Sequence, residues 1–121
     1  MHYASKAYAK TAADTAPPRE LEANLLLSAA ARLQAVHDSW SDKPAGLYEA
    51  LTYNRKLWTI FIDSVTHDDN RLPLKLRQNI ASLGMFVMGE TFSMITKPSQ
   101  RYLASLIDIN RRIAAGLRGK A

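Results

Sequence analysis

Hydrophobic side chains recur every three or four residues along most of this chain, which is the spacing of one face of an α-helix. Four segments show the pattern, at about 18–40, 47–65, 73–96 and 100–117. No run of alternating apolar and polar residues bounded by turn signals occurs, so no strand is predicted. The stripes predict a buried core made of Leu25, Leu33, Leu51, Trp58, Phe61, Ile80, Leu83, Val87, Leu106 and Ile113.

Proline and small polar residues separate the four segments. Pro17 and Pro18 suit the start of a helix, and the stretches at 41–46, 66–70 and 97–99 have the composition of turns. Short loops between long amphipathic helices make neighbouring helices antiparallel. We therefore predict an all-α fold, an up-and-down bundle of four long helices preceded by a short N-terminal helix at about 3–14. Residues 1–16 contain few large apolar side chains, so we expect this segment to fray or to become ordered only when it binds a partner.

The composition is that of one globular domain over residues 1–121, with 47% hydrophobic and 22% charged residues. Because there is no cysteine, disulfides, thiolate nucleophiles and cysteine zinc sites are excluded, and a cytoplasmic location is expected. The longest apolar stretch, 80–95, contains glycines and polar residues and is too short for a membrane span. We expect no membrane association.

A net charge of +5 raises the question of nucleic-acid binding. Most basic residues are interleaved with acidic ones, and no nucleic-acid motif accompanies them. They cluster only at the C-terminal end, at Arg111, Arg112, Arg118 and Lys120. Cations near the C-terminal carbonyls of a helix explain that cluster more simply, so nucleic acid is not an expected partner.

Groups able to do chemistry are scarce. Asp63 and His67 are four residues apart and are followed by Asp68 and Asp69, which is a conceivable metal cluster. A helix ending in an Asp-rich and Asn-rich turn explains the same residues better, because such side chains satisfy free backbone groups. Phosphate loops and nucleophile elbows are absent from the sequence. We expect no enzyme activity, no metal and no cofactor.

Two asparagines interrupt otherwise apolar stripes, Asn54 in the second long segment and Asn110 in the fourth. A buried amide costs stability unless it is hydrogen-bonded, and it can fix the register of a helix. We interpret the two residues as a structural polar seam. A direct role in gripping the backbone of a partner is the alternative.

The third long segment has more large apolar side chains than one seam can bury. Leu83 and Val87 fill the seam, so part of a further set must lie elsewhere. This set is Met85, Phe86, Met88 and Phe92. Tyr53 and Leu57 flank the seam of the preceding segment and are predicted to form the other wall of a groove. These six residues are our candidates for partner binding, because methionine and aromatic surfaces suit helix-in-groove recognition. The alternative is that the third segment is simply the most buried helix.

Five stretches of the sequence together are specific for one family: AYAKT (7–11), PRELEANLL (18–26), ALTYNRKLWTIF (50–61), LRQNIASLG (76–84) and LIDINRRIAAGLRG (106–119). Through these stretches the chain resembles the FlaF flagellar-biosynthesis family of alphaproteobacteria over almost its whole length. The resemblance implies a cytoplasmic factor for flagellin production and export that binds flagellin in the manner of a secretion chaperone, beside the regulator FlbT. The alternative is a post-transcriptional regulator that acts with FlbT or on flagellin mRNA.

Overall fold

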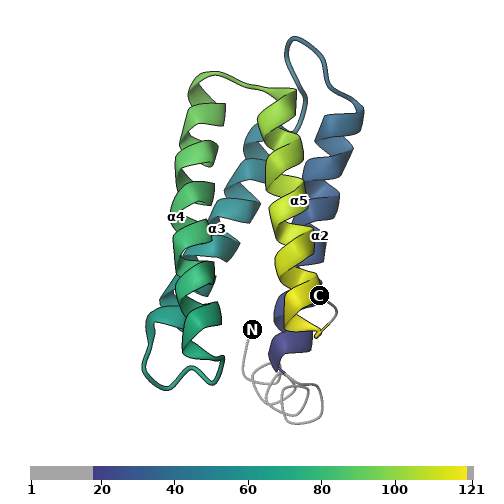
Figure 1. Ribbon diagram of the computed structural model, residues 1–121. Helices are drawn as coiled ribbons and strands as arrows, with labels where there is room; N and C mark the ends of the chain where they lie inside the picture. The colour runs from purple at the N-terminus through teal and green to yellow at the C-terminus, as the bar shows by residue number, and fades with distance from the viewer. Residues whose placement is uncertain (1–17, 120–121) are drawn as a thin grey trace, which may run out of the picture.

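The computed structural model describes residues 18–119, and this part of the chain contains four helices and no strand. The helices are α2 (Pro18–Asp38), α3 (Leu47–Thr66), α4 (Leu74–Thr96) and α5 (Gln100–Leu117). They run alternately up and down, as Figure 1 shows, which confirms the predicted all-α bundle. The short helix expected at about 3–14 lies outside the described residues.

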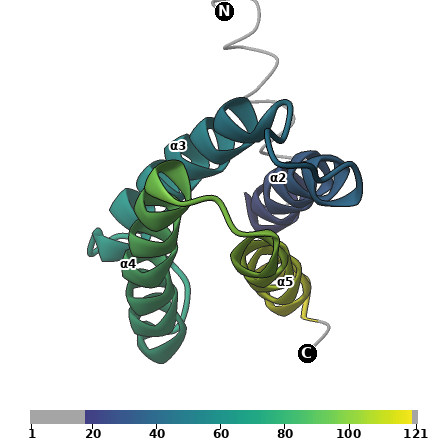
Figure 2. The same cartoon turned by 90° about the horizontal axis from the view of Figure 1, so that it is seen from above.

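Seen from above, α4, α3, α2 and α5 follow one another around the bundle (Figure 2). The most extensive packing joins α2 to α5, and α3 packs on α4 and on α2. Contact between α4 and α5 is more limited. No helix in the described part of the chain has a stretch long and apolar enough to cross a membrane.

The turn residues start the helices in identifiable ways. Gly46 precedes α3 with a φ of 77°, in the left-handed region that favours glycine. Ser99 caps α5, because its side-chain oxygen accepts a hydrogen bond from the backbone N–H of Tyr102. In the α3–α4 turn, Asn70 accepts a hydrogen bond from the backbone N–H of Leu72 at 2.9 Å. The predicted turns are therefore places where backbone groups find partners.

Gly84 allows the close approach of α4 to α3. A Cβ atom added to Gly84 would lie 2.4 Å from Cγ1 of Ile62 and 3.4 Å from the ring of Trp58. Gly89, five residues further along α4, has no neighbouring atom within 4 Å of an added Cβ. Only the first of these two glycines is thus required by packing.

Most of the predicted core is buried, but Leu25 is not. Its side chain is 46% exposed, whereas that of Leu26 is 1% exposed. Successive residues lie about 100° apart around a helix. Because three leucines follow one another here, either Leu25 or Leu26 could belong to the buried stripe. The backbone carbonyl of Leu26 accepts a weak hydrogen bond from Asn110 of α5. Leu83 and Ile113, also predicted as core, are half-buried and pack against the buried core.

Candidate functional site

Apolar side chains form an exposed strip on α4. Met85, Phe92 and Ile95 are 70%, 73% and 48% exposed, and Met88 between them is half-buried against the core. Their spacings of three, four and three residues place these four residues on one side of the helix. We call them the α4 strip. The helix does not bury its apolar surplus, so the interpretation of this segment as the most buried helix is wrong.

The six candidate binding residues do not form a single groove. Phe86 is 49% exposed but follows Met85 directly, so it lies about 100° away around α4. Tyr53 and Leu57 are on the side of α3 that faces α2, where they line pockets together with α2 residues. The expectation that they form the second wall of a groove with α4 is therefore wrong. The sequence pattern placed them beside the seam without showing which neighbour they would face.

The side of α3 that faces α2 has its own groove. A pocket of about 140 Å³ is lined by Glu22 and Leu25 of α2 and by Leu57 and Ile60 of α3. A second, of about 360 Å³, lies further along the two helices and is lined by Arg32, Tyr53 and Lys56. We define the α2–α3 groove by these two pockets and a third at its far end. Sequence reasoning missed this groove because it assigned Leu25 to the core.

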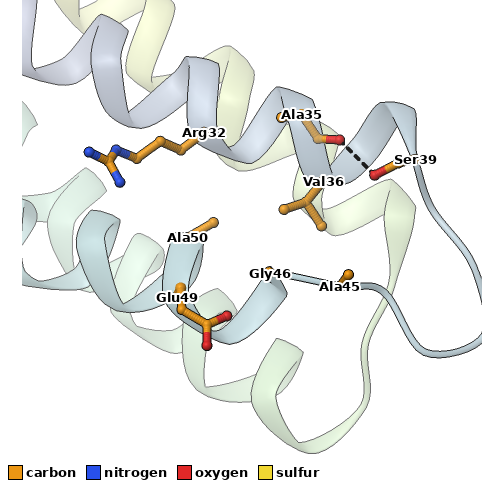
Figure 3. Close-up of a pocket in the computed structure, with 8 residues that line it drawn as sticks. All are labelled: Arg32, Ala35, Val36, Ser39, Ala45, Gly46, Glu49 and Ala50. Atoms are coloured by element: carbon orange, nitrogen blue, oxygen red, sulfur yellow. Dashed lines mark hydrogen bonds between the residues drawn. The ribbon is translucent and has the colours of Figure 1, made fainter.

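The third pocket, of about 340 Å³, closes the far end of the α2–α3 groove (Figure 3). Val36 of α2 reaches toward the backbone at Gly46, and Ala50 of α3 completes an apolar floor. Arg32 and Glu49 line both this pocket and the one before it, so the two hollows are adjacent. The groove thus has an apolar floor with charged side chains along its rim.

Charge is unevenly placed along this rim. The guanidinium of Arg32 lies over the ring of Tyr53, 4.1 Å from its centroid, which is a cation–π contact. No ion pair with Arg32 occurs among residues 18–119. At the other end, burial raises the pKa of the Glu22 carboxyl, and the nearby charge of Arg19 acts in the opposite direction. Glu22 is thus a carboxylate held against an apolar pocket.

The two seam asparagines lie together at the centre of the bundle, and both are fully buried. Asn110 donates to Oδ1 of Asn54 at 2.7 Å and accepts from the indole N–H of Trp58 at 2.9 Å. Nδ2 of Asn54 is buried and has no hydrogen-bond partner. The cluster ties α3 to α5 across the bundle, with Asn110 as its most connected member.

Several other charged residues have structural partners. Arg111 donates to Gln34 at 3.1 Å, and Arg118 pairs with Glu20 of α2 at 3.1 Å. Nδ1 of His67 lies 2.6 Å from the carbonyl oxygen of Asp63, as expected for a helix end. Within residues 18–119, no group of three or more His, Cys, Asp or Glu side chains is placed to hold a metal ion.

These features define a small antiparallel helical bundle with two separate apolar surfaces, the α4 strip and the α2–α3 groove. The chain belongs to the family of the flagellar protein FlaF, whose family model matches residues 4–117. This match confirms the resemblance found in the sequence and gives the protein a flagellar role. No curated protein and no solved structure matches the chain.

Proposed function

We propose that this protein is a cytoplasmic flagellin-binding factor, chaperone-like in action, that supports flagellin production and export during flagellum assembly. The observation that carries the proposal is the α4 strip, since adjacent large apolar side chains on a surface mark sites of interaction. Membership of a flagellar family supports a flagellar role, and flagellin is the partner that we propose for that role. The protein would act by binding and not by catalysis.

The chemistry of the α4 strip suits an amphipathic segment. Methionine side chains are flexible and polarisable, so Met85 and Met88 can adapt to an irregular apolar partner. Flagellin segments that are unfolded before assembly would bury their apolar side on this strip and order as they bind. Covering such segments keeps the subunit from aggregating and competent for export.

Size-exclusion chromatography of the protein mixed with monomeric flagellin tests the proposal. We expect a complex with the wild-type protein and about thirtyfold weaker binding with Phe92→Ala, because a central anchor typically contributes about 2 kcal/mol. Phe92→Ala is preferable to Met88→Ala, since Met88 also packs on the core. Tyr102→Ala is the matched control, because Tyr102 is an exposed aromatic residue on α5.

Melting curves must accompany the binding data. Weaker binding by Phe92→Ala with unchanged melting supports the α4 strip. If a folded Met85, Met88 and Phe92 triple-alanine variant binds flagellin with wild-type affinity, the strip is the wrong surface. The basic α5 surface would then be the next to test.

The alternative, a post-transcriptional regulator acting with FlbT or on flagellin mRNA, rests on positive charge. Pairing of Arg118 with Glu20 and of Arg112 with Asp108 reduces the charge available for phosphate at the end of α5. A salt titration separates the two functions. RNA binding should weaken steeply between low and moderate salt, whereas binding to an apolar strip should change little.

A further inference from the structure

Two apolar surfaces lie on different sides of this bundle. Ile62 of α3 faces Gly84 of α4, whereas Leu57 of α3 faces Leu25 of α2. Five residues separate Leu57 from Ile62, which is about 140° around the helix. The α4 strip and the α2–α3 groove are therefore separate surfaces, with α3 lying between α4 and α2 (Figure 2). A segment that binds only at the α4 strip would leave the α2–α3 groove empty.

The groove has the dimensions of a helical segment. The three pockets that define it follow one another along α2 between Glu22 and Val36, which at about 1.5 Å per residue is about 20 Å, or nearly four helical turns. Leu25 and Ile60 stand on its two walls and are 46% and 68% exposed. Small residues such as Ala50 on its floor permit close approach of another backbone.

Charges along the rim indicate which helix would fit. Glu22 lines the pocket nearest the start of α2, and burial raises the pKa of this carboxyl, so a cation on a docked segment would offset the cost of burying its negative charge. Further along, Arg32 and Lys56 outnumber the single carboxylate of Glu49. A complementary helix has a basic side chain at the Glu22 end and an acidic side chain about two to three turns away.

We propose that the α2–α3 groove is a second docking site, which takes a second amphipathic helical segment of the same partner while the α4 strip holds the first. The inference rests on the proposed function, because it takes flagellin as that partner. Two linked segments gripped at once bind far more tightly than either alone, since the second binding event becomes intramolecular. The segment in the groove lies with its basic end at Glu22.

Synthetic peptides covering the N-terminal and C-terminal segments of flagellin provide the test. Each peptide is labelled and titrated by fluorescence anisotropy against the full-length protein and against Ile60→Asp, Phe92→Asp and the control Tyr102→Asp. We expect Ile60→Asp to weaken one peptide at least thirtyfold and the other less than twofold. Phe92→Asp should show the opposite preference, and Tyr102→Asp should change neither.

The charge of the groove is tested with the same peptides. Glu22→Gln should weaken the groove peptide about threefold to tenfold while leaving the strip peptide unchanged, and Arg32→Gln should do the same. Both losses should shrink as salt is raised, because they concern charges at a rim. Equal affinity of the groove peptide for wild type and for both variants overturns the charge assignment.

Several outcomes would overturn the second site. One is competition between the two peptides for a single site on the wild-type protein. Another is normal binding of both by a folded Ile60→Asp variant. A photo-crosslinking side chain placed at position 60 should capture flagellin, and capture of residues 1–17 or of a second copy in its place contradicts the proposal. If wild-type protein binds no flagellin at all, the proposed function itself fails.

Discussion

Replacing Asn110 with leucine should destabilise the protein far more than replacing Asn54. Asn110→Leu removes the acceptor of the Trp58 indole N–H and the donor to Oδ1 of Asn54, both fully buried. Each buried polar group left unpaired costs about 1–3 kcal/mol. Added apolar burial by leucine offsets part of this, so we expect a net loss of about 2–4 kcal/mol.

Asn54→Leu has opposing effects on the unfolding free energy. It removes one acceptor of Asn110, but it also removes Nδ2 of Asn54, which is buried and already unpaired. The amide of Asn110 keeps its longer contact with the carbonyl of Leu26 at 3.4 Å. These effects largely cancel, and the expected change in unfolding free energy is within about 1 kcal/mol.

Urea denaturation of the two single variants and the double variant measures these terms. Because the double variant no longer contains the stranded Asn54 amide, it should be more stable than Asn110→Leu by about 1–2 kcal/mol. Domain stabilities are only about 5–15 kcal/mol, so differences of this size are readily measured. Equal destabilisation by the two single variants, or additive losses in the double variant, would refute the conclusion that Asn110 contributes more hydrogen-bond stabilisation than Asn54.

Three further predictions concern packing and pH. Gly84→Ala should lower the unfolding free energy by about 1–3 kcal/mol, because the new Cβ meets Ile62. Gly89→Ala should raise the unfolding free energy by about 0.5–1 kcal/mol, because alanine favours a helix more than glycine does and has open space there. Urea denaturation curves that show a change of the same sign for both variants would contradict this prediction. Glu22→Gln should stabilise the protein at neutral pH. The pKa of the Glu22 carboxyl is raised in the folded protein, so the stability of the wild-type protein falls as pH rises above 4.5, the usual pKa of a glutamate. Melting curves at several pH values should show that the stability gained by Glu22→Gln disappears in acid. The imidazole pKa of His67 is raised, chiefly by the Asp63 carbonyl, so its small stabilising contribution is present below pH 6.5 and lost as pH rises through the folded value. NMR titration of His67 checks this, and a pKa at or below 6.5 would contradict it.

Helix positions were predictable because each long segment has a regular apolar spacing and ends at proline, glycine or small polar residues. The side of each helix that is buried was harder to predict. In α2, the run Leu25, Leu26 and Leu27 allows more than one choice of buried stripe, and packing within the bundle places Leu26 in the core. Sequence periodicity identifies a stripe, but the neighbouring helix decides its centre.

The candidate surfaces were predictable only in part. The surplus of large apolar residues on α4 was visible in the sequence, and Met85 and Phe92 are exposed. The groove between α2 and α3 was not predictable, since it depends on how closely two helices pack along their length. Similarly, the sequence picked out Asn54 and Asn110 but could not show that Trp58 joins them, because that contact spans 52 positions in the chain.

Methionine methyl NMR tests the central claim most directly. The chain has four methionines, of which Met85 is exposed on the α4 strip, Met88 is half-buried within it, and Met94 is fully buried. Titration with unlabelled monomeric flagellin should shift or broaden the methyl signals of Met85 and Met88 and leave that of Met94 nearly unchanged. Unchanged Met85 and Met88 signals at saturating flagellin would contradict the account.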